Sequence, residues 1–254
     1  MGLRRLFKNY LYKKKFDISS KKHVGSKLKQ KNILITGANS GIGYALTEKF
    51  LQLNHFVLAT YNNKKENLVK LGGENLKICQ CDLSKIENID FLINHIKKKS
   101  INILINNAGT WGGKNQNFNE IDYENFLKAS NINAISILRL SETVLKYSKK
   151  DSLDSILNIS SQFGSIEDNT SGTNYVYRGT KSMMNSFSKN LSIDLKRDYG
   201  VNVISICPGN VKTKMNPGGI LNPKNIALNI IDILENSESY NGKFIDLNKN
   251  ELTW

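Results

Sequence analysis

Tyr177 and Lys181 stand four residues apart in the stretch SGTNYVYRGTKSMMNSF, and this pair could carry out proton transfer. Positions i and i+4 share one face of a helix, so the lysine ammonium would lie beside the phenol. A nearby positive charge favours the ionised phenolate and would help Tyr177 give up a proton. The spacing alone is not diagnostic, because the chain repeats it within residues 1–31 and again at Tyr61. Whether this pair forms an active site therefore depends on the strands and helices that surround it.

Beyond residue 31, short apolar runs alternate with segments of helical periodicity. We expect strands at 32–36, 56–60, 76–81, 101–107, 155–160, 201–207 and near 243–247, and helices at 43–53, 86–99, 120–148, 175–198 and 223–236. Apolar runs separated by amphipathic helices indicate a parallel sheet covered on both faces. The prediction is an α/β chain: a single-domain, doubly wound parallel sheet (Rossmann fold), with its ligand site beyond the carboxyl ends of the strands.

Length and composition favour one large domain over two small ones. The chain has 254 residues and a formal charge of +14, but residues 1–31 hold eleven Lys/Arg and one acid, which leaves only +4 for residues 32–254. No run of 18 uncharged apolar residues is present, so the sequence predicts no bilayer-spanning helix. The three cysteines and three histidines lack the spacing of metal ligands, and we expect no metal site.

The basic N-terminal extension, residues 1–31, differs from the rest of the chain. Leu3, Leu6, Phe7, Tyr10 and Leu11 follow a helical apolar pattern with Lys and Arg between them. This is typical of an amphipathic helix that makes weak contact with an anionic membrane surface. A solvated, disordered arm is the alternative. Because no apolar signal-peptide core follows the basic start, we expect a cytoplasmic protein.

The loops after the first two strands could bind a nucleotide. The first, TGANSGIG, places Gly37, Gly41 and Gly43 between a strand and a helix, where glycines let backbone N–H groups approach a pyrophosphate. After the second strand, NAD sites usually carry an acid that holds the ribose 2′-hydroxyl. Here Lys64 and Lys65 precede any acid and are available to a 2′-phosphate, which favours NADP(H). A solvated turn is the alternative.

The later strand ends carry further polar residues. Asp82 could accept a hydrogen bond from an adenine amino group or cap the next helix. NNAG (106–109) could lie against a nucleotide or form a plain turn. Ser161 stands at the end of the fifth strand, 16 residues before Tyr177, and PGNVKT (208–213) follows the sixth. These loops meet at one edge of the predicted sheet, and Tyr177 opens the helix beside them.

Together, TGANSGIG, NNAG, PGNVKT and the Ser161, Tyr177 and Lys181 set resemble the short-chain dehydrogenase/reductases over residues 32–254. The segments YRGTKSMMN, PGNVKTKM and GKFIDLNKNELTW resemble the C-factor/sniffer group of carbonyl reductases. The resemblance implies that Tyr177 is the catalytic acid/base, that Ser161 hydrogen-bonds the substrate oxygen, and that Lys181 binds the nicotinamide ribose and lowers the tyrosine pKa. Asn133 matches the asparagine that helps to hold a proton-relay water; Asn131, or an asparagine that merely faces solvent, is the alternative.

The same resemblance implies a set of cofactor contacts. Besides the three glycines, Tyr177 and Lys181, these are Asn39, Ser40, Ile42, Asn62, Lys64, Asp82, Leu83, Asn107, Ala108, Gly109, Pro208, Val211 and Thr213. Asn62 departs from the arginine that NADP-using members often carry, so the preference for NADP(H) over NAD(H) rests on the lysines that follow. Residues 1–31 have no fixed counterpart in the family.

The expected function is NAD(P)(H)-dependent interconversion of a carbonyl and an alcohol on a small molecule. A non-catalytic nucleotide sensor on the same fold and a nucleic-acid-binding protein are the alternatives; the charge distribution argues against the second. Trp111, Gln162, Phe163, Tyr175 and Met215 are expected to flank a partly apolar pocket, with 214–223 as a lid. The two long helices either pair in a homo-oligomer or cover the sheet.

Overall fold

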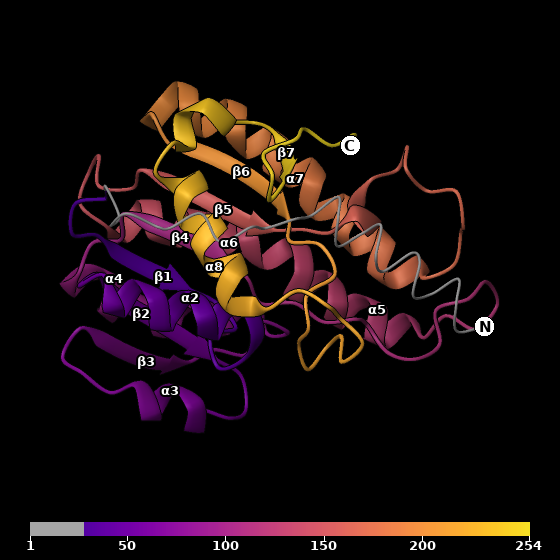
Figure 1. The fold of residues 1–254 in the computed structure, drawn as a ribbon, viewed down its shortest axis with the longest axis horizontal. Helices are drawn as coiled ribbons and strands as arrows, with labels where there is room; N and C mark the ends of the chain where they lie inside the picture. Colours follow the sequence, from indigo (N-terminus) through magenta and orange to yellow (C-terminus); the bar gives the residue numbers. More distant parts are fainter. Residues whose placement is uncertain (1–27) are drawn as a thin grey trace.

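The computed structural model describes residues 28–254, in which seven parallel strands form one sheet (Figure 1). The strand order is β3-β2-β1-β4-β5-β6-β7. The strands are β1 (Asn32–Ile35), β2 (Phe56–Tyr61), β3 (Leu76–Gln80), β4 (Ile103–Asn106), β5 (Ser155–Ile159), β6 (Asn202–Cys207) and β7 (Phe244–Asp246). Each lies within a residue or two of an expected apolar run, so the predicted sheet is confirmed.

Helices cover both faces of the sheet, as the continuous apolar strands require. They are α2 (Gly41–Gln52), α3 (Glu66–Leu71), α4 (Ile93–Lys98), α5 (Tyr123–Ser130), α6 (Ser136–Tyr147), α7 (Tyr175–Tyr199) and α8 (Pro223–Leu234). On one face, α2, α3 and α8 pack through Phe50, Leu68 and Ile230. On the other, α4, α6 and α7 pack through side chains that include Ile96 and Val144. The doubly wound fold is therefore confirmed.

Two predicted helices are interrupted, and α3 was not predicted. The segment at 86–99 begins as a 3-10 helix, η1 (Ile86–Leu92), before α4. The long helix expected at 120–148 is divided by the π-helix η2 (Asn131–Ile135), which separates α5 from α6. The side chain of Asn133, in this π-turn, is hydrogen-bonded to Thr110 and Thr180, and hydrophobic periodicity carries no sign of such bonds. The remaining short helices are η3 (Gln162–Gly164) and η4 (Ser237–Tyr240).

The start of the described chain is fixed to the sheet. The Phe56 amide donates to the Lys31 carbonyl at 3.0 Å, and the Lys31 ammonium pairs with Asp154 at 2.7 Å. Most of the basic extension lies outside the described residues, so its amphipathic or disordered character stays a prediction. None of the helices within residues 28–254 combines the length and apolar character needed to cross a bilayer.

Candidate functional site

A large cleft of about 1320 Å³ runs along the carboxyl ends of the strands. The strand arrows run from left to right in Figure 1, so this edge lies at the right of the sheet. The catalytic residues and cofactor contacts that the resemblance implies all line the cleft except Gly43 and Asn133. The topology thus brings loops from six strands together, as the sequence predicted.

The loop after β1 turns sharply and is locked to the loop after β4. Gly37 and Gly41 have φ values of +62° and +57°, a region that L side chains rarely adopt. The Thr36 hydroxyl accepts from the amides of Asn107 and Ala108 at 3.0 Å each. Gly43 lies behind this loop: a Cβ there would come within 2.4 Å of the Asn107 side-chain nitrogen. Its small size therefore serves close packing of α2 against the loops.

The loop after β2 presents charges of both signs to the cleft. Asn62, Lys64 and Glu66 line it, whereas Lys65 precedes α3 and does not. The Asn39 side chain accepts from the Leu68 amide at 3.3 Å, which ties the glycine loop to α3. Glu66 was not among the predicted contacts. It stands in the first turn of α3, a helix too short to be predicted from its apolar pattern.

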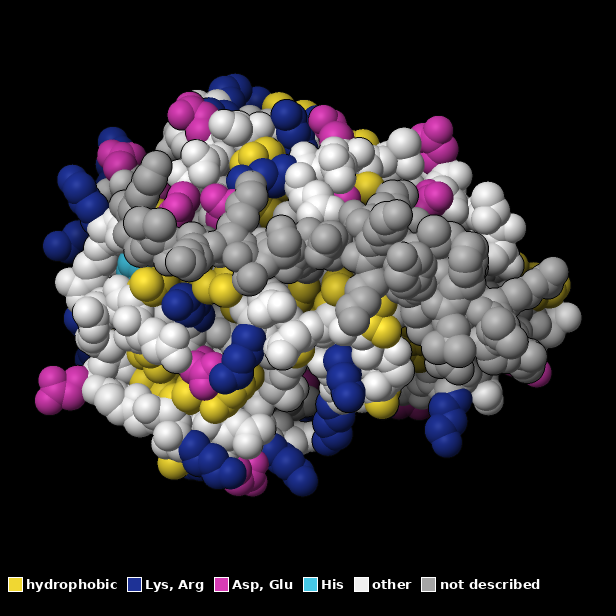
Figure 2. Space-filling model, viewed as in Figure 1, with side chains coloured by type: hydrophobic (Ala, Val, Ile, Leu, Met, Phe, Trp, Pro, Cys, Tyr) yellow, Lys and Arg dark blue, Asp and Glu magenta, His cyan; other side chains and the backbone are white. Residues whose placement is uncertain are grey.

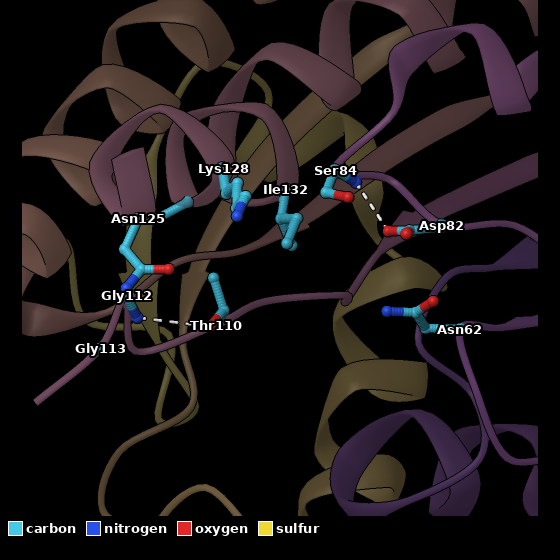
Figure 3. A pocket seen from close by; sticks show the side chains of 10 residues that line it. Asn62, Asp82, Ser84, Thr110, Gly112, Gly113, Asn125, Lys128 and Ile132 are labelled. Carbon is cyan, nitrogen blue, oxygen red and sulfur yellow. Dashed lines mark hydrogen bonds between the residues drawn. The ribbon is translucent and has the colours of Figure 1, made fainter. Parts of the chain in front are cut away.

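A smaller cavity of about 230 Å³ adjoins the cleft between α5 and the loops after β2, β3 and β4. Figure 3 shows Asn62 and Asp82 on one side and Lys128 of α5 on the other. One Asp82 carboxylate oxygen accepts from the Ser84 amide at 3.0 Å, so this carboxylate stabilises the turn before η1. The cavity continues the cleft at the end where the predicted adenine contact lies.

Tyr177 is held in place by Gln116, a residue that sequence reasoning missed. Asn174 precedes α7 without capping it through its side chain. The Gln116 side-chain carbonyl instead accepts from the Tyr177 amide at 2.9 Å, and the Gln116 backbone carbonyl accepts from Tyr175 at 3.1 Å. Gln116 is 3 % exposed and also donates to the Trp111 carbonyl. No local pattern in the sequence marks a cap supplied from so far away.

Aromatic rings surround the Tyr177 phenol. The Trp111 ring stacks on it with centroids 4.4 Å apart, and the Phe163 ring meets it edge-on at 5.8 Å. Trp111, Phe163, Gln162 and Met215 line the cleft as expected. Tyr175 does not; it is exposed, and its ring contacts Phe118.

Burial governs the ionisation of Tyr177 and Lys181. Burial raises the pKa of Tyr177 to about 12, while a hydrogen bond from the Ser161 hydroxyl acts in the opposite direction. The Lys181 ammonium donates to the Ile159 carbonyl at 2.7 Å and lies 5.9 Å from the centre of the Tyr177 ring. Burial lowers the pKa of Lys181 to about 8. The expected lowering of the tyrosine pKa by this lysine is therefore not produced by the protein groups alone.

Asn133 lies under the cleft and is fully buried. Its side-chain oxygen accepts from the Thr110 amide at 2.7 Å, and its side-chain nitrogen donates to the Thr110 carbonyl and the Thr180 hydroxyl at 2.9 Å each. Thr180 in turn donates to the Tyr177 carbonyl at 3.1 Å. Asn131 instead donates to the Ser84 carbonyl. The structure thus connects Asn133, and not Asn131, to the helix that carries Tyr177.

The predicted lid, 214–223, is hydrogen-bonded to residues 210–212, which follow β6. Asn216 donates through its side chain to Asn210 and Val211, and the Lys212 amide donates to the Leu221 carbonyl. A Cβ on Gly219 would come within 2.3 Å of the Val211 backbone. This glycine therefore permits close packing at the base of the segment.

Comparison with known families agrees with this geometry. The family model for short chain dehydrogenase matches residues 31–219. The chain belongs to the short-chain dehydrogenase family. It is therefore an oxidoreductase, and the resemblance predicted from its motifs is confirmed.

Other members of the family match most of the chain. The NADP-dependent 3-hydroxy acid dehydrogenase YdfG of Escherichia coli is 32% identical over 70% of this chain and 71% of its own. The carbonyl reductase Sniffer of D. melanogaster has a TM-score of 0.80 and is 28% identical, with 89% of this chain and all of that one covered. A short-chain dehydrogenase/reductase of Burkholderia multivorans, solved with bound NADP, has a TM-score of 0.79 at 26% identity over the same shares of the two chains. The similarity to sniffer-like carbonyl reductases is thus confirmed.

Thr180 supplies a direct test of the network under the cleft. Thr180→Val keeps the shape of the side chain but leaves the buried Asn133 amide without one acceptor, a loss that costs about 1–3 kcal/mol. We expect a lower melting temperature and slower turnover. Thr180→Ser keeps the hydroxyl and should stay close to wild type in both measurements. A Thr180→Val variant that is as stable and as active as wild type would show that the hydroxyl bridge does not matter.

Proposed function

We propose that the cleft holds a nicotinamide dinucleotide and that Tyr177 transfers the proton while a carbonyl and an alcohol are interconverted. The observation that carries this proposal is the Tyr177 hydroxyl, hydrogen-bonded to Ser161 at the end of β5 and backed by the buried ammonium of Lys181. A chain that only bound a nucleotide would have no need of an acid beside a second hydroxyl.

The residues around the glycine loop fit a dinucleotide. Ser40 precedes α2 without a side-chain cap, and the first turn of α2 contains no acid, so the positive end of this helix is open to an anion. Asn39, Gly41, Ile42 and Thr213 line the cleft at this point. They would hold the pyrophosphate, whereas Leu83 and Asp82 would hold the adenine.

NADP(H) is favoured over NAD(H) as the cofactor. The charge within reach of a 2′-phosphate comes from Lys64, which lines the cleft beside Asn62. Two relatives support this preference: the Escherichia coli enzyme is NADP-dependent, and the Burkholderia protein contains NADP. Glu66 lies on the same lining and would oppose a phosphate, so Lys64 must outweigh it.

When bound, the nicotinamide supplies or accepts the hydride. The protein's own groups manage the proton. Because its pKa is about 12, Tyr177 is protonated at neutral pH and can donate to an alkoxide that develops on the substrate. The Ser161 hydroxyl would stabilise the same oxygen as negative charge builds there.

In the direction of alcohol oxidation, Tyr177 must act as a base. Ionising a phenol of pKa about 12 at pH 7 costs roughly 7 kcal/mol, since each pKa unit corresponds to about 1.4 kcal/mol. In the protein alone, the buried Lys181 ammonium does not offset this cost, because burial keeps the pKa of Tyr177 raised. Without the cofactor, the protein groups keep Tyr177 protonated, which is the form that carbonyl reduction requires.

The main role of Asn133 would be to hold Thr110 in place, and binding a water would be secondary. Both donors of its amide are already engaged, by Thr110 and Thr180, so only one lone pair of its oxygen is left for a relay water. Its proposed role is to fix Thr110 under the nicotinamide end of the cleft.

Residues 1–31 as a membrane-contacting arm, a cytoplasmic location and assembly into a homo-oligomer stay predictions from the sequence. The substrate is a small carbonyl compound or alcohol, and the aromatic lining of Trp111 and Phe163 favours one with an apolar part.

Tyr177→Phe tests the proton-transfer role. The variant keeps the ring stacked on Trp111 and removes only the hydroxyl, so reduction of carbonyl substrates should slow by at least about a hundredfold while cofactor affinity is retained. Steady-state assays over a panel of ketones and aldehydes, with calorimetric titration of NADPH, measure both. Turnover equal to wild type would refute the mechanism, and a wild-type chain that binds NADPH without oxidising it would favour a sensor.

Lys64→Ala tests the cofactor preference. Loss of a charge-assisted contact to the 2′-phosphate should weaken NADPH binding roughly tenfold and leave NADH binding unchanged. Glu66→Gln is the matched control, since it removes the opposing charge from the same part of the cleft lining and should bind NADPH as tightly as wild type or tighter. Isothermal titration of each cofactor decides, and tighter binding of NADH than NADPH by the wild-type protein would reverse the assignment.

A further inference from the structure

The edge of the sheet opposite the cleft carries a dense group of lysines, which we call the lysine edge. Its members are Lys29, Lys31, Lys77, Lys97, Lys98, Lys99, Lys146, Lys149 and Lys150. We propose that the lysine edge docks the folded domain on an anionic lipid surface. This inference is independent of the reaction in the cleft.

Topology brings these lysines together. Lys31 immediately precedes β1, Lys77 lies at the start of β3, Lys99 precedes β4 and Lys150 precedes β5. Because the strands are parallel, their first residues share one edge of the sheet. Dark blue side chains are seen along the left border of the molecule in Figure 2, the side on which Figure 1 shows α4 and the strand starts.

Direct contacts connect the segments that carry the lysines. The Lys149 amide donates to the Ser100 hydroxyl at 2.9 Å, which joins the end of α6 to the end of α4. The ammonium groups of Lys97 and Lys146 lie over the same Tyr147 ring, at 5.1 and 5.4 Å from its centre. These contacts join the lysines at the end of α4 to those at the end of α6.

The positive charge of the lysine edge is largely unbalanced. The segments that carry these lysines (29–31, 74–77, 97–99 and 146–154) also hold three acids, Glu74, Asp151 and Asp154, so nine lysines against three carboxylates leave +6. Within residues 28–254, the one ion pair that these lysines make is Lys31 with Asp154. At the start of β6, by contrast, Lys196 and Arg197 are paired with nearby carboxylates.

Helix dipoles account for only part of this arrangement. A cation in the last turn of a helix is stabilised by the negative helix end, which explains Lys97, Lys98 and Lys146. Lys149 and Lys150 lie beyond the end of α6 and are exposed. Neighbouring ammonium groups repel one another. This repulsion is relieved when a surface of opposite charge approaches.

The chemistry of the lysine edge fits lipid headgroups better than nucleic acid. Its nine cations are lysines, and Arg197, which stands before β6, is already paired with Asp194 and Asp198, whereas a free arginine binds phosphates and bases bidentately. Proteins that bind single-stranded nucleic acids also present exposed aromatic rings, on which the bases stack. The rings here, Tyr147 and Phe56, are part-buried, and lysine ammonium groups already lie over them. Point charges on long flexible stems match the diffuse negative potential of an anionic leaflet.

Docking through this edge would leave the catalytic cleft open to solvent, since the cleft lies at the opposite ends of the same strands. The basic extension joins the described chain at this edge, just before β1. Residues 1–27 contain nine Lys/Arg and one acid, so by sequence they would add +8 to the same electrostatic attraction.

The test uses the full chain and co-sedimentation with vesicles of phosphatidylcholine, with and without phosphatidylserine. The variant Lys98→Gln, Lys149→Gln, Lys150→Gln removes three exposed lysines that make no ring contact or ion pair with another described residue. We expect its affinity for the phosphatidylserine vesicles to fall roughly tenfold or more at low salt, with the melting temperature and reductase activity retained.

The matched control is Lys85→Gln, Lys114→Gln, Lys212→Gln, which removes the same charge from exposed positions after β3, β4 and β6, at the opposite edge. It should bind the vesicles like wild type. Equal losses in the two variants would overturn the proposal, as would a wild-type protein that ignores phosphatidylserine. Fluorescence polarisation with an RNA oligonucleotide is the third arm: tighter binding to RNA than to vesicles, lost in the first variant, would reassign the surface to nucleic acid.

Discussion

The hydrogen bond from the buried Lys181 ammonium to the Ile159 carbonyl is the interaction on which the candidate site depends. It joins α7 to the last residue of β5 at 2.7 Å and places a positive charge under the Tyr177 phenol. Burying an ammonium group is costly unless the group is well bonded, and the lowered pKa of Lys181 reflects that cost. Such a cation is maintained only where the surrounding fold compensates, which is typical of functional sites.

The rest of the site keeps this arrangement rigid. Gln116, in the segment between β4 and α5, holds the first turn of α7, and Asn133 joins the loop after β4 to Thr180, one residue before Lys181. Thr36 and Asn107 lock the glycine loop to the same β4 loop. Each support is a hydrogen bond between segments that the parallel sheet brings to one edge. Proton transfer depends on such fixed geometry, because the acid must be within hydrogen-bond reach of the developing alkoxide.

Much of this could be predicted from the sequence, since the relevant signals are local. Apolar runs gave the seven strands, parallel topology placed their loops at one edge, and the motifs TGANSGIG, NNAG and PGNVKT marked the lining of the cleft. The π-turn around Asn133 and the capping of α7 by Gln116 could not be predicted, because both depend on bonds between residues far apart in the chain. The raised pKa of Tyr177 could not be predicted either, because it comes from burial, and the spacing of residues in the sequence says nothing of burial.

The central claim is that Tyr177 is held protonated by its surroundings and becomes a base only when positive charge joins it in the cleft. The most direct measurement is an NMR titration of tyrosine ring carbons in the labelled protein, with Tyr177 assigned from the signal absent in the phenylalanine variant. Burial predicts a pKa of about 12 for Tyr177 in the protein alone and a clearly lower value after NADP⁺ is added. A titration near 10 that NADP⁺ leaves unchanged would contradict it.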